Sequence, residues 1–246
     1  MENLNPLISI ITAVKNGEKH LEECFESLQN QSYKNFEHIV IDGGSTDQTL
    51  EIINNHKSKI KFFSSQKDEG IYDGFNKGME QASGEYLGFL NSDDILLPDA
   101  LMTLKKYIVN KNYPDFIFGS VRKHWGILHG YKPWKIKFSW GFYSSHSTGF
   151  YIKNSSSKII GKYDLRYKYS SDWDYFYRMI VKHKMRGVAT KKNEIFGVFR
   201  RGGFSSKISF YDHFTEEIKI RLNNEQNRIL ILLIYIYKYI KNLSKL

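Results

Sequence analysis

Two adjacent carboxylates, Asp93 and Asp94, follow an apolar run at Tyr86–Leu90 that is typical of a buried strand. Adjacent carboxylates repel each other, but the pair becomes stable when a hard divalent cation lies between it and a polyanionic ligand. Mg²⁺ and Mn²⁺ prefer oxygen ligands, and proteins commonly hold them with one or two carboxylates plus substrate phosphates. The pair is therefore a candidate site for a metal and a phosphate, although a lone Ser-Asp-Asp sequence is more often an ordinary loop or a helix cap.

Two further carboxylates stand at positions where chemistry or local structure could use them. Asp42 opens the turn Asp-Gly-Gly-Ser-Thr-Asp after an apolar run, and it could bind a ligand or make an Asx-type turn with Asp47. Asp172, in Ser-Asp-Trp-Asp, could be an N-cap for the helix that follows. Asp174 and Arg178 have the i, i+4 spacing of a helix-surface ion pair.

The elements that must position these residues alternate along the first half of the chain. We expect strands at Leu7–Val14, Phe36–Ile41, Ile60–Ser65, Tyr86–Leu90 and Phe116–Val121, with helices at His20–Gln31, 46–57, 71–82 and from Pro98 onward. Strands that alternate with helices favour a mostly parallel sheet covered on both faces. Ligands of such sheets bind at the carboxyl ends of the strands, so Asp42 and the Asp93-Asp94 pair are expected to face one crevice.

The alternation weakens after about residue 122, where tryptophans and tyrosines are scattered among lysines. We expect strands at Gly149–Ile152 and Gly187–Val198, a helix at Asp172–Lys184, and a helical end from about Phe210. There are no internal repeats and no low-complexity linker. We therefore predict one continuous unit, residues 1–205, whose halves are 1–122 and 123–205, followed by a C-terminal helical extension, 206–246.

Composition and charge narrow the class of protein. Of 246 residues, 41% are hydrophobic, which indicates a folded globular chain, and the single cysteine, Cys24, excludes an intramolecular disulfide framework. The N-terminus lacks the pattern of a signal peptide, and no stretch reaches the roughly 20 apolar residues that cross a bilayer. We expect a soluble or peripheral intracellular protein.

The net charge of +10 is unevenly distributed. Residues 1–150 carry 16 Lys and Arg against 18 Asp and Glu, a net charge of −2, whereas residues 151–246 carry 20 against 8, a net charge of +12. A catalytic half joined to a basic half that meets an anionic surface or substrate would explain this asymmetry. The alternative is a solvated, lysine-rich surface.

Taken together and in order, these motifs carry a family resemblance. They run PLISIITAVKNGEKHLEECFESLQNQSYKNFEHIVIDGGSTDQTLEII, then KDEGIYDGFNKGMEQASGEYLGFLNSDD, then SSDWDYFYRM. The chain from about Pro6 to Phe199 resembles the family 2 inverting glycosyltransferases, particularly those of bacterial surface-polysaccharide synthesis. The resemblance implies an α/β, GT-A-like (Rossmann-like) fold with a mostly parallel sheet flanked by helices, and a basic, aromatic-rich acceptor region.

The resemblance also implies roles for individual residues. Thr12, Asp42 and Asp68 match positions that contact the nucleoside of a nucleotide-sugar, and Lys77 matches a basic position near the diphosphate. Asp93 matches the last acid of the family's Asp-x-Asp motif, which holds the metal and the donor.

Asn91 replaces the first acid of that motif, so the metal, Mn²⁺ or Mg²⁺, would depend on Asp93 with help from Asp94. Asp172 matches the catalytic base, and His146 matches a histidine beside the acceptor cleft, although a buried structural histidine is the commoner case. Lys77 could equally be a solvent-exposed helix residue.

The chemistry fits these residue types. Inverting transfer is one in-line displacement at the anomeric carbon, and the attacking hydroxyl must lose a proton to a carboxylate within reach. A free Asp has a pKa of about 3.9 and is ionised at neutral pH. The departing nucleoside diphosphate gains negative charge that a divalent ion and a lysine can stabilise. Cys24, on an expected helix with no base beside it, is assigned to the core.

The expected activity is therefore metal-dependent transfer of a sugar, from a UDP-sugar by preference, to a saccharide acceptor. In O-antigen, capsule or lipooligosaccharide synthesis that acceptor is often linked to a lipid, at the inner face of the cell membrane. The apolar run Ile229–Tyr237, followed by Lys238 and Lys241, is too short to span and could lie in the membrane interface. It could equally pack on the sheet or form a homodimer.

Two other functions are weaker alternatives. A sugar nucleotidyltransferase of similar fold would carry a glycine-rich, basic stretch after the first strand, but Thr12–Gly17 contains one glycine only. A nucleic-acid-binding protein is suggested by the pI of about 9.4 and by the interleaved aromatic residues. The acidic residues of the first half would repel phosphates without a metal, and we therefore expect no nucleic-acid partner.

Overall fold

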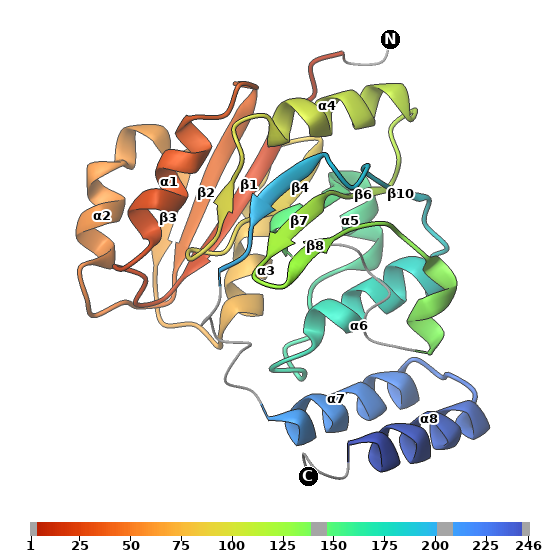
Figure 1. The fold of residues 1–246 in the computed structure, drawn as a ribbon. Helices are drawn as coiled ribbons and strands as arrows, with labels where there is room; N and C mark the ends of the chain where they lie inside the picture. Colours follow the sequence, from red (N-terminus) through yellow and green to blue (C-terminus); the bar gives the residue numbers. More distant parts are fainter. Residues whose placement is uncertain (1–3, 139–146, 201–208, 243–246) are drawn as a thin grey trace.

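The computed structural model describes residues 4–138, 147–200 and 209–242. Its centre is a seven-stranded sheet in the order β10-β6-β9-β4-β1-β2-β3, and a four-stranded sheet in the order β5-β11-β7-β8 adjoins it (Figure 1). The strands are β1 (Ile8–Val14), β2 (Phe36–Asp42), β3 (Phe62–Ser65), β4 (Tyr86–Phe89), β5 (Ile95–Leu96), β6 (Phe116–Phe118), β7 (Ser120–Lys123), β8 (Gly126–Leu128), β9 (Phe150–Lys153), β10 (Gly187–Ala189) and β11 (Ile195–Val198).

Helices pack around both sheets. They are α1 (Leu21–Gln29), α2 (Thr49–Asn55), α3 (Ile71–Gln81), α4 (Ala100–Asn110), α5 (Asn154–Ile160), α6 (Ser171–Tyr177), α7 (Phe210–Asn223) and α8 (Arg228–Lys241). A π-helical turn, η4 (Arg178–Lys182), continues α6, and 3-10 turns lie at η1 (Lys57–Lys59), η2 (Pro133–Lys137) and η3 (Ser147–Gly149). The predicted alternation and the mostly parallel sheet flanked by helices are confirmed.

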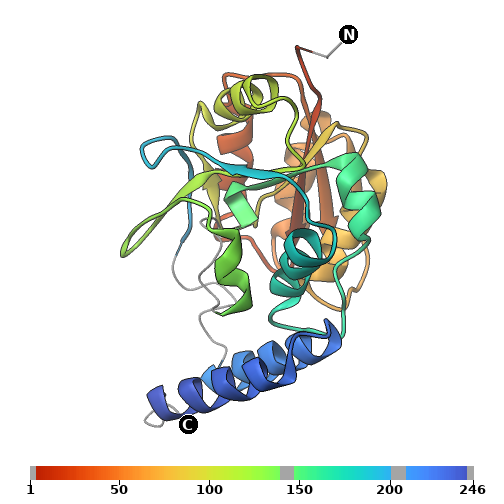
Figure 2. The same cartoon turned by 90° about the vertical axis from the view of Figure 1, so that its right-hand side faces the viewer.

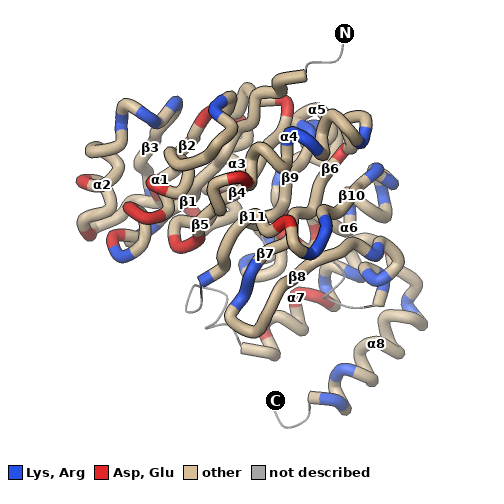
Figure 3. The backbone as a smooth tube through the Cα atoms, turned by 45° about the horizontal axis from the view of Figure 1, so that its top comes forward, with Lys and Arg blue, Asp and Glu red and all other residues tan. Residues whose placement is uncertain are grey.

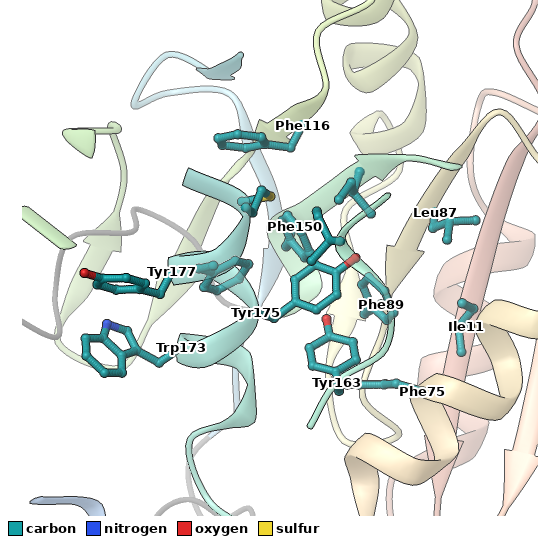
Figure 4. Packing of buried hydrophobic residues seen from close by; sticks show 14 of the residues in the cluster. Ile11, Phe75, Leu87, Phe89, Phe116, Phe150, Tyr163, Trp173, Tyr175 and Tyr177 are labelled. Carbon is teal, nitrogen blue, oxygen red and sulfur yellow. The ribbon is translucent and has the colours of Figure 1, made fainter. Parts of the chain in front are cut away.

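The central strands are buried on both faces, which explains why they read as unbroken apolar runs. Successive residues of β1 alternate between two hydrophobic cores: Ile10 packs with the residues of α1 and α4, and Ile11 packs with those of α3 and α6. In the second core Phe75 and Phe89 meet edge to face, with Tyr163 and Tyr175 stacked beside them (Figure 4). Burying a large apolar side chain contributes roughly 1.5–3 kcal/mol, so these layers fix the sheet against its helices.

Two strand predictions were wrong in the same way, because each run divides between the two sheets. The run 116–121 splits at Gly119 into β6 and β7, and a Cβ at Gly119 would lie 2.4 Å from the ring of Phe196. Only glycine lets the chain pass that ring as it crosses from one sheet to the other. The run 187–198 splits into β10 and β11 around a turn in which Glu194 donates its N–H to the carbonyl of Lys191.

The sheet is also not wholly parallel. Strand β9 runs antiparallel to both β4 and β6, whereas β1 is parallel to β2 and β4. The register pairs Val14 with Asp42 and Ile11 with Phe89. The carboxyl ends of β1, β2 and β4 therefore reach the same edge of the sheet, as the sequence predicts.

The C-terminal helices α7 and α8 form an antiparallel hairpin that lies beside α6 (Figures 1 and 2). Acidic residues gather on the side of α1 and β5, while lysine and arginine predominate around α6, β10 and α8 (Figure 3). The acidic and basic residues, which are unevenly distributed along the sequence, therefore also lie on different sides of the molecule.

His38, on β2, makes the stability of the fold depend on pH. Its ring is buried, lies 3.0 Å from the hydroxyl of Thr12 and meets Phe25 edge to face, and burial lowers its pKa to about 3. Between that value and the ordinary pKa of about 6.5, the unfolded chain binds a proton that the folded chain does not, so stability falls as pH falls.

We expect the wild type to lose about 2 kcal/mol of unfolding free energy through His38 between pH 7 and pH 5. Urea denaturation at both pH values measures the loss, and His38→Gln, which cannot titrate, should lose correspondingly less. Equal losses in the two proteins would show that His38 is not held neutral.

Candidate active site

Asp42 ends β2 with its carboxylate fully buried and surrounded by donors. It accepts hydrogen bonds from the backbone N–H groups of Gly44 and Ser45 and from the hydroxyls of Ser45 and Ser65. Gly44 has a φ of 79°, in the left-handed region that favours glycine. Asp42 therefore does form the Asx-type turn, and that turn fixes the loop at the carboxyl edge of the sheet.

Asp68 lies directly over this turn. A Cβ at Gly43 would lie 2.6 Å from Oδ2 of Asp68, so glycine is what allows the carboxylate to approach the backbone. Burial raises the pKa of Asp68, while the N–H of Gly70 and the charge of Lys77 oppose that rise. The structure thus brings Asp68 and Asp42 together at one edge, as expected for two groups that share a ligand.

Thr12 and Lys77, the other two residues predicted to contact the donor, are held by neighbours. Thr12 lies inside β1 and is fully buried, with its hydroxyl bonded to His38. Lys77 lies on α3 and forms an i, i+4 ion pair with Asp73, Nζ to Oδ2 2.8 Å, with a third of its side chain exposed. Thr12 therefore supports the strand from inside, and Lys77 remains close enough to act on Asp68.

The two adjacent carboxylates after β4 have different surroundings in the structure. Asp94 is fully buried and accepts from the hydroxyl of Thr148 at 2.7 Å, the N–H of Arg200 at 3.2 Å and the amide of Asn91 at 3.2 Å. Asp93 is only partly buried. Asp94 thus ties the β4–β5 turn to η3 and to the chain after β11, whereas Asp93 is the carboxylate with access to a ligand.

Asn91 supplies a further side-chain oxygen in the same turn as Asp93. Because its Nδ2 donates to Asp94, its Oδ1 is fixed in place, and this buried atom accepts no hydrogen bond among the described residues. An oxygen of this kind is left over for a cation or a donor group. The described residues contain no group of three His, Cys, Asp or Glu side chains that could hold a metal alone, so a metal here would need oxygens from its substrate and water.

Cys24 lies next to this turn as a core residue, as predicted. Its thiol is buried and donates to the carbonyl of Asn91 at 3.5 Å. Burial and the charges of Asp94 and Asp93 raise the pKa of Cys24 well above its ordinary value. A thiol that stays protonated is not a nucleophile.

Asp172 stands in the first turn of α6. Its Oδ1 accepts from the N–H of Trp173 at 2.8 Å and from the hydroxyl of Tyr72 at 3.2 Å. Tyr72 belongs to α3, which begins three residues after Asp68. The tyrosine therefore joins Asp172 to α3, the helix that follows Asp68. The sequence analysis did not single out Tyr72, which lies within the quoted segment KDEGIYDGFNKG.

Helix α7 holds the segment that leads into Asp172. The carboxylate of Glu216 accepts the N–H groups of Lys168 at 2.7 Å and Tyr169 at 2.9 Å. One turn away, His213 Nδ1 lies 3.3 Å from the hydroxyl of Ser170. Near the end of α7, Asn224 donates to Asp174 at 2.8 Å. The division of the chain at residue 206 stays a prediction, but α7 is built into the site rather than appended to it.

Lys123, at the end of β7, was missed by the sequence analysis. Its Nζ lies 4.5 Å from the centre of the Phe199 ring. Burial lowers the pKa of Lys123, and the charges of Asp94 and Asp172 act in the opposite sense. A half-buried cation within electrostatic range of both carboxylates suits a phosphate. Lysines are so common in this half that no pattern distinguishes this one. His146 lies outside the described residues.

The fold, with acidic residues at the carboxyl edge of a mostly parallel sheet, is that of GT-A glycosyltransferases. Residues 9–176 match the family described as glycosyl transferase family 2. The chain belongs to this family and is a glycosyltransferase.

Individual relatives agree. A "PGL/p-HBAD biosynthesis glycosyltransferase" of Mycobacterium bovis is 30% identical over 207 residues, covering 78% of this chain and 79% of that protein. A "GalNAc(5)-diNAcBac-PP-undecaprenol beta-1,3-glucosyltransferase" of Campylobacter jejuni is 38% identical over 119 residues, covering 47% of this chain and 38% of that protein.

Solved structures share the fold. Residues 1–349 of S. aureus TarS in complex with UDP-GlcNAc superpose with a TM-score of 0.69 at 20% identity, covering 93% of this chain and 70% of that one. The mannosyltransferase PcManGT of Pyrobaculum calidifontis, in complex with GDP-Man and Mn²⁺, gives a TM-score of 0.65 at 14% identity, covering 96% and 70%. Neither the nucleotidyltransferase nor the nucleic-acid alternative gains support from these comparisons.

The different surroundings of Asp93 and Asp94 predict different costs of removing them. Asp94→Ala leaves the buried hydroxyl of Thr148 and two partly buried donors without their acceptor, and we expect a loss of roughly 2–4 kcal/mol of unfolding free energy. Asp93→Ala should lose much less, because this side chain is partly exposed. Urea denaturation of the two variants measures the difference, and equal losses would contradict the division of roles between them.

The contacts of Glu216 predict an effect on the rate without an effect on donor binding. Glu216→Ala removes both acceptors that hold 168–169, so we expect kcat to fall about 10- to 100-fold while the KM for the donor stays within about twofold. Glu216→Gln, which keeps one acceptor oxygen, should restore part of the rate. A variant in which kcat is unchanged, or in which only the KM rises, would show that α7 does not position Asp172.

Proposed function

We propose that this glycosyltransferase is a metal-dependent, inverting enzyme that moves a sugar from a UDP-sugar to a saccharide acceptor. The observation that carries the proposal is the position of Asp172. Its carboxylate is bonded to Tyr72 of α3, the helix that follows Asp68, and so it faces the edge where Asp42 and Asp68 lie. A base on one side of a crevice and nucleotide-binding acids on the other is the arrangement that direct transfer requires.

The nucleoside end of the donor is assigned to Asp42 and Asp68. Asp42 holds the loop 43–45 rigid, and Asp68, lying over Gly43, accepts hydrogen bonds from ribose or base. Thr12 is proposed to act indirectly: its hydroxyl is bonded to His38 in the neighbouring strand β2 and so supports the strands that carry the site. The bound UDP-GlcNAc of TarS supports the choice of a uridine nucleotide, since that protein shares this fold.

The diphosphate end is assigned to Asp93, with the side-chain oxygen Oδ1 of Asn91 from the same turn. These are the oxygens that Mn²⁺ or Mg²⁺ prefers, and Asp94 contributes by fixing the turn. A divalent cation bound there supplies positive charge that stabilises the departing diphosphate. The Mn²⁺ in the complex of PcManGT supports a divalent ion in this fold. Lys123 and Lys77 add positive charge from the protein itself.

The transfer step follows from the placement of Asp172. Its carboxylate accepts the proton of the acceptor hydroxyl as the oxygen attacks the anomeric carbon, and the bond from that carbon to the diphosphate oxygen breaks on the opposite face. The backbone N–H of Trp173 and the hydroxyl of Tyr72 hold the carboxylate in position. One displacement inverts the configuration, and no covalent intermediate forms.

The acceptor is proposed to be a lipid-linked saccharide used in surface polysaccharide synthesis, O-antigen, capsule or lipooligosaccharide. Two observations support this. The relative from C. jejuni is named for an undecaprenol-diphosphate-linked saccharide, and residues 151–246 of this chain have a net charge of +12. An acceptor of this kind places the enzyme at the cytoplasmic face of the membrane.

Asp172→Asn tests the proposal, because it preserves the shape of the side chain and removes its basicity. With UDP-sugars and a lipid-linked saccharide as substrates, we expect kcat to fall at least about 100-fold, while the Kd for UDP stays within about threefold. Nuclear magnetic resonance of the wild-type product should show the inverted anomeric configuration. Retention of configuration, or an active Asp172→Asn variant, would refute the assigned base.

A further inference from the structure

We propose that the outward face of α8 docks onto an anionic lipid bilayer, with the helix axis lying along the surface. This inference rests on the proposed function only in that a lipid-linked acceptor gives the docking a purpose. The binding itself needs neither donor nor acceptor and can be measured without them.

The outward face of α8 is apolar along its whole length. Its members follow the helical repeat i, i+3, i+4, i+7, i+8, i+11 and are exposed to 45–71%: Ile229, Leu232, Leu233, Ile236, Tyr237 and Ile240. This spacing places them on one side of the helix. A contiguous stripe of large exposed apolar side chains is rare on a monomeric protein surface and marks an interaction site.

The inward face of α8 is already occupied, so the stripe is not a core face left open. Ile231 and Ile234 are buried in the hairpin, and Tyr235 stacks on Phe214 of α7 at 5.2 Å. Lys238, which the sequence suggested would flank the apolar run at the membrane, instead turns inward and pairs with Glu217 at 2.5 Å. The outward face of α8 therefore does not include the positive charge of Lys238, which the sequence alone would have placed beside the apolar run.

The charges of α8 indicate which partner fits the stripe. The helix contains no acidic residue, and its exposed charges are Arg228 at the first position and Lys241 at the last. Positive charges at both ends of an apolar stripe complement anionic lipid headgroups. Tyrosines 237 and 239, near Lys241, are of the type that prefers the interface between headgroups and acyl chains.

The same charges disfavour a second copy of the chain. Two α8 helices packed antiparallel would place Arg228 of one near Lys241 of the other, and parallel packing would place each cation near its own equivalent. Both arrangements bring like charges together beside a dry interface. Fourteen residues make a helix about 21 Å long, so α8 cannot cross a bilayer, and no helix among the described residues is long and apolar enough to do so.

Docking through α8 would present the acceptor site to the membrane. Lys238 bonds Glu217, Glu217 bonds Arg221, and the guanidinium of Arg221 lies 4.8 Å from the ring of Trp173, next to Asp172. All of these groups are largely buried, so the hairpin is joined firmly to α6. A lipid-linked saccharide held at the surface would then lie on the side of the molecule that carries the proposed base.

Co-sedimentation with vesicles tests the inference, using the full chain and no substrate. We expect the wild type to bind vesicles of phosphatidylcholine with phosphatidylglycerol, and to bind vesicles of phosphatidylcholine alone at least tenfold more weakly. The double variant Leu232→Ser, Leu233→Ser should lose at least tenfold in affinity for the anionic vesicles, and Arg228→Gln with Lys241→Gln should lose most of the preference for them. Ile159→Ser is the matched control, since Ile159 is 64% exposed on α5, outside the stripe.

Two results would overturn the inference. One is equal vesicle binding by the wild type and the Leu232, Leu233 double variant, with circular dichroism showing both folded. The other is a wild-type dimer, detected by light scattering, that dissociates in the double variant while neither protein binds vesicles. Calorimetric titration with UDP separates this question from the proposed function: vesicle binding without any UDP binding leaves the docking face standing and refutes the donor assignment.

Discussion

Repulsion among carboxylates gathered at one edge of the sheet is the constraint on which the rest of the site depends. The register of β1 to β4 brings Asp42, Asp68 and the Asp93-Asp94 pair to that edge, and the fold reduces their mutual repulsion in two ways. Asp42 and Asp94 are buried and surrounded by donors, so they hold loops in place. Asp68 and Asp93 remain partly accessible, and a sugar nucleotide with its cation would complete their neutralisation. Asp42 and Asp94 therefore shape the site, whereas Asp68 and Asp93 are the acids that we propose to contact the donor and its cation directly.

The proposed base is held from two sides, which connects distant parts of the chain. Tyr72 reaches Asp172 from α3, on the donor side, and Glu216 fixes the preceding segment from α7. A helix that the sequence places after the catalytic region thus takes part in orienting it. Because α7 is paired with α8 through the buried ion pair of Glu217 and Lys238, the acceptor side and the surface-exposed hairpin form one structural unit. This organisation suits an enzyme whose acceptor is presented by a surface.

Much of the fold could be predicted from the sequence, because the strands and helices of the parallel core each have a recognisable local pattern of apolar residues. Buried strands appear as apolar runs, helices as amphipathic periods, and the turn after β2 as Asp-Gly-Gly. The features that could not be predicted depend on contacts between residues far apart in the sequence. The split of a strand at Gly119 depends on the Phe196 ring, and the burial of Asp94 depends on donors 54 and 106 residues away. Local periodicity likewise placed Lys238 at the flank of an apolar run, while the fold turned it toward Glu217. The assigned roles of Thr12 and Lys77 in donor binding remain predictions.

The central claim is that the edge containing Asp42, Asp68 and Asp93 binds a uridine nucleotide together with a divalent cation. Calorimetric titration of UDP and GDP into the wild type and Asp93→Ala, with and without Mn²⁺, tests it most directly. The account predicts micromolar binding of UDP that requires Mn²⁺, weaker binding of GDP, and loss of the Mn²⁺-dependent binding in a folded Asp93→Ala variant. Binding of UDP that is unchanged by Mn²⁺ or by the substitution would contradict the account, as would no binding of either nucleotide to the folded wild type.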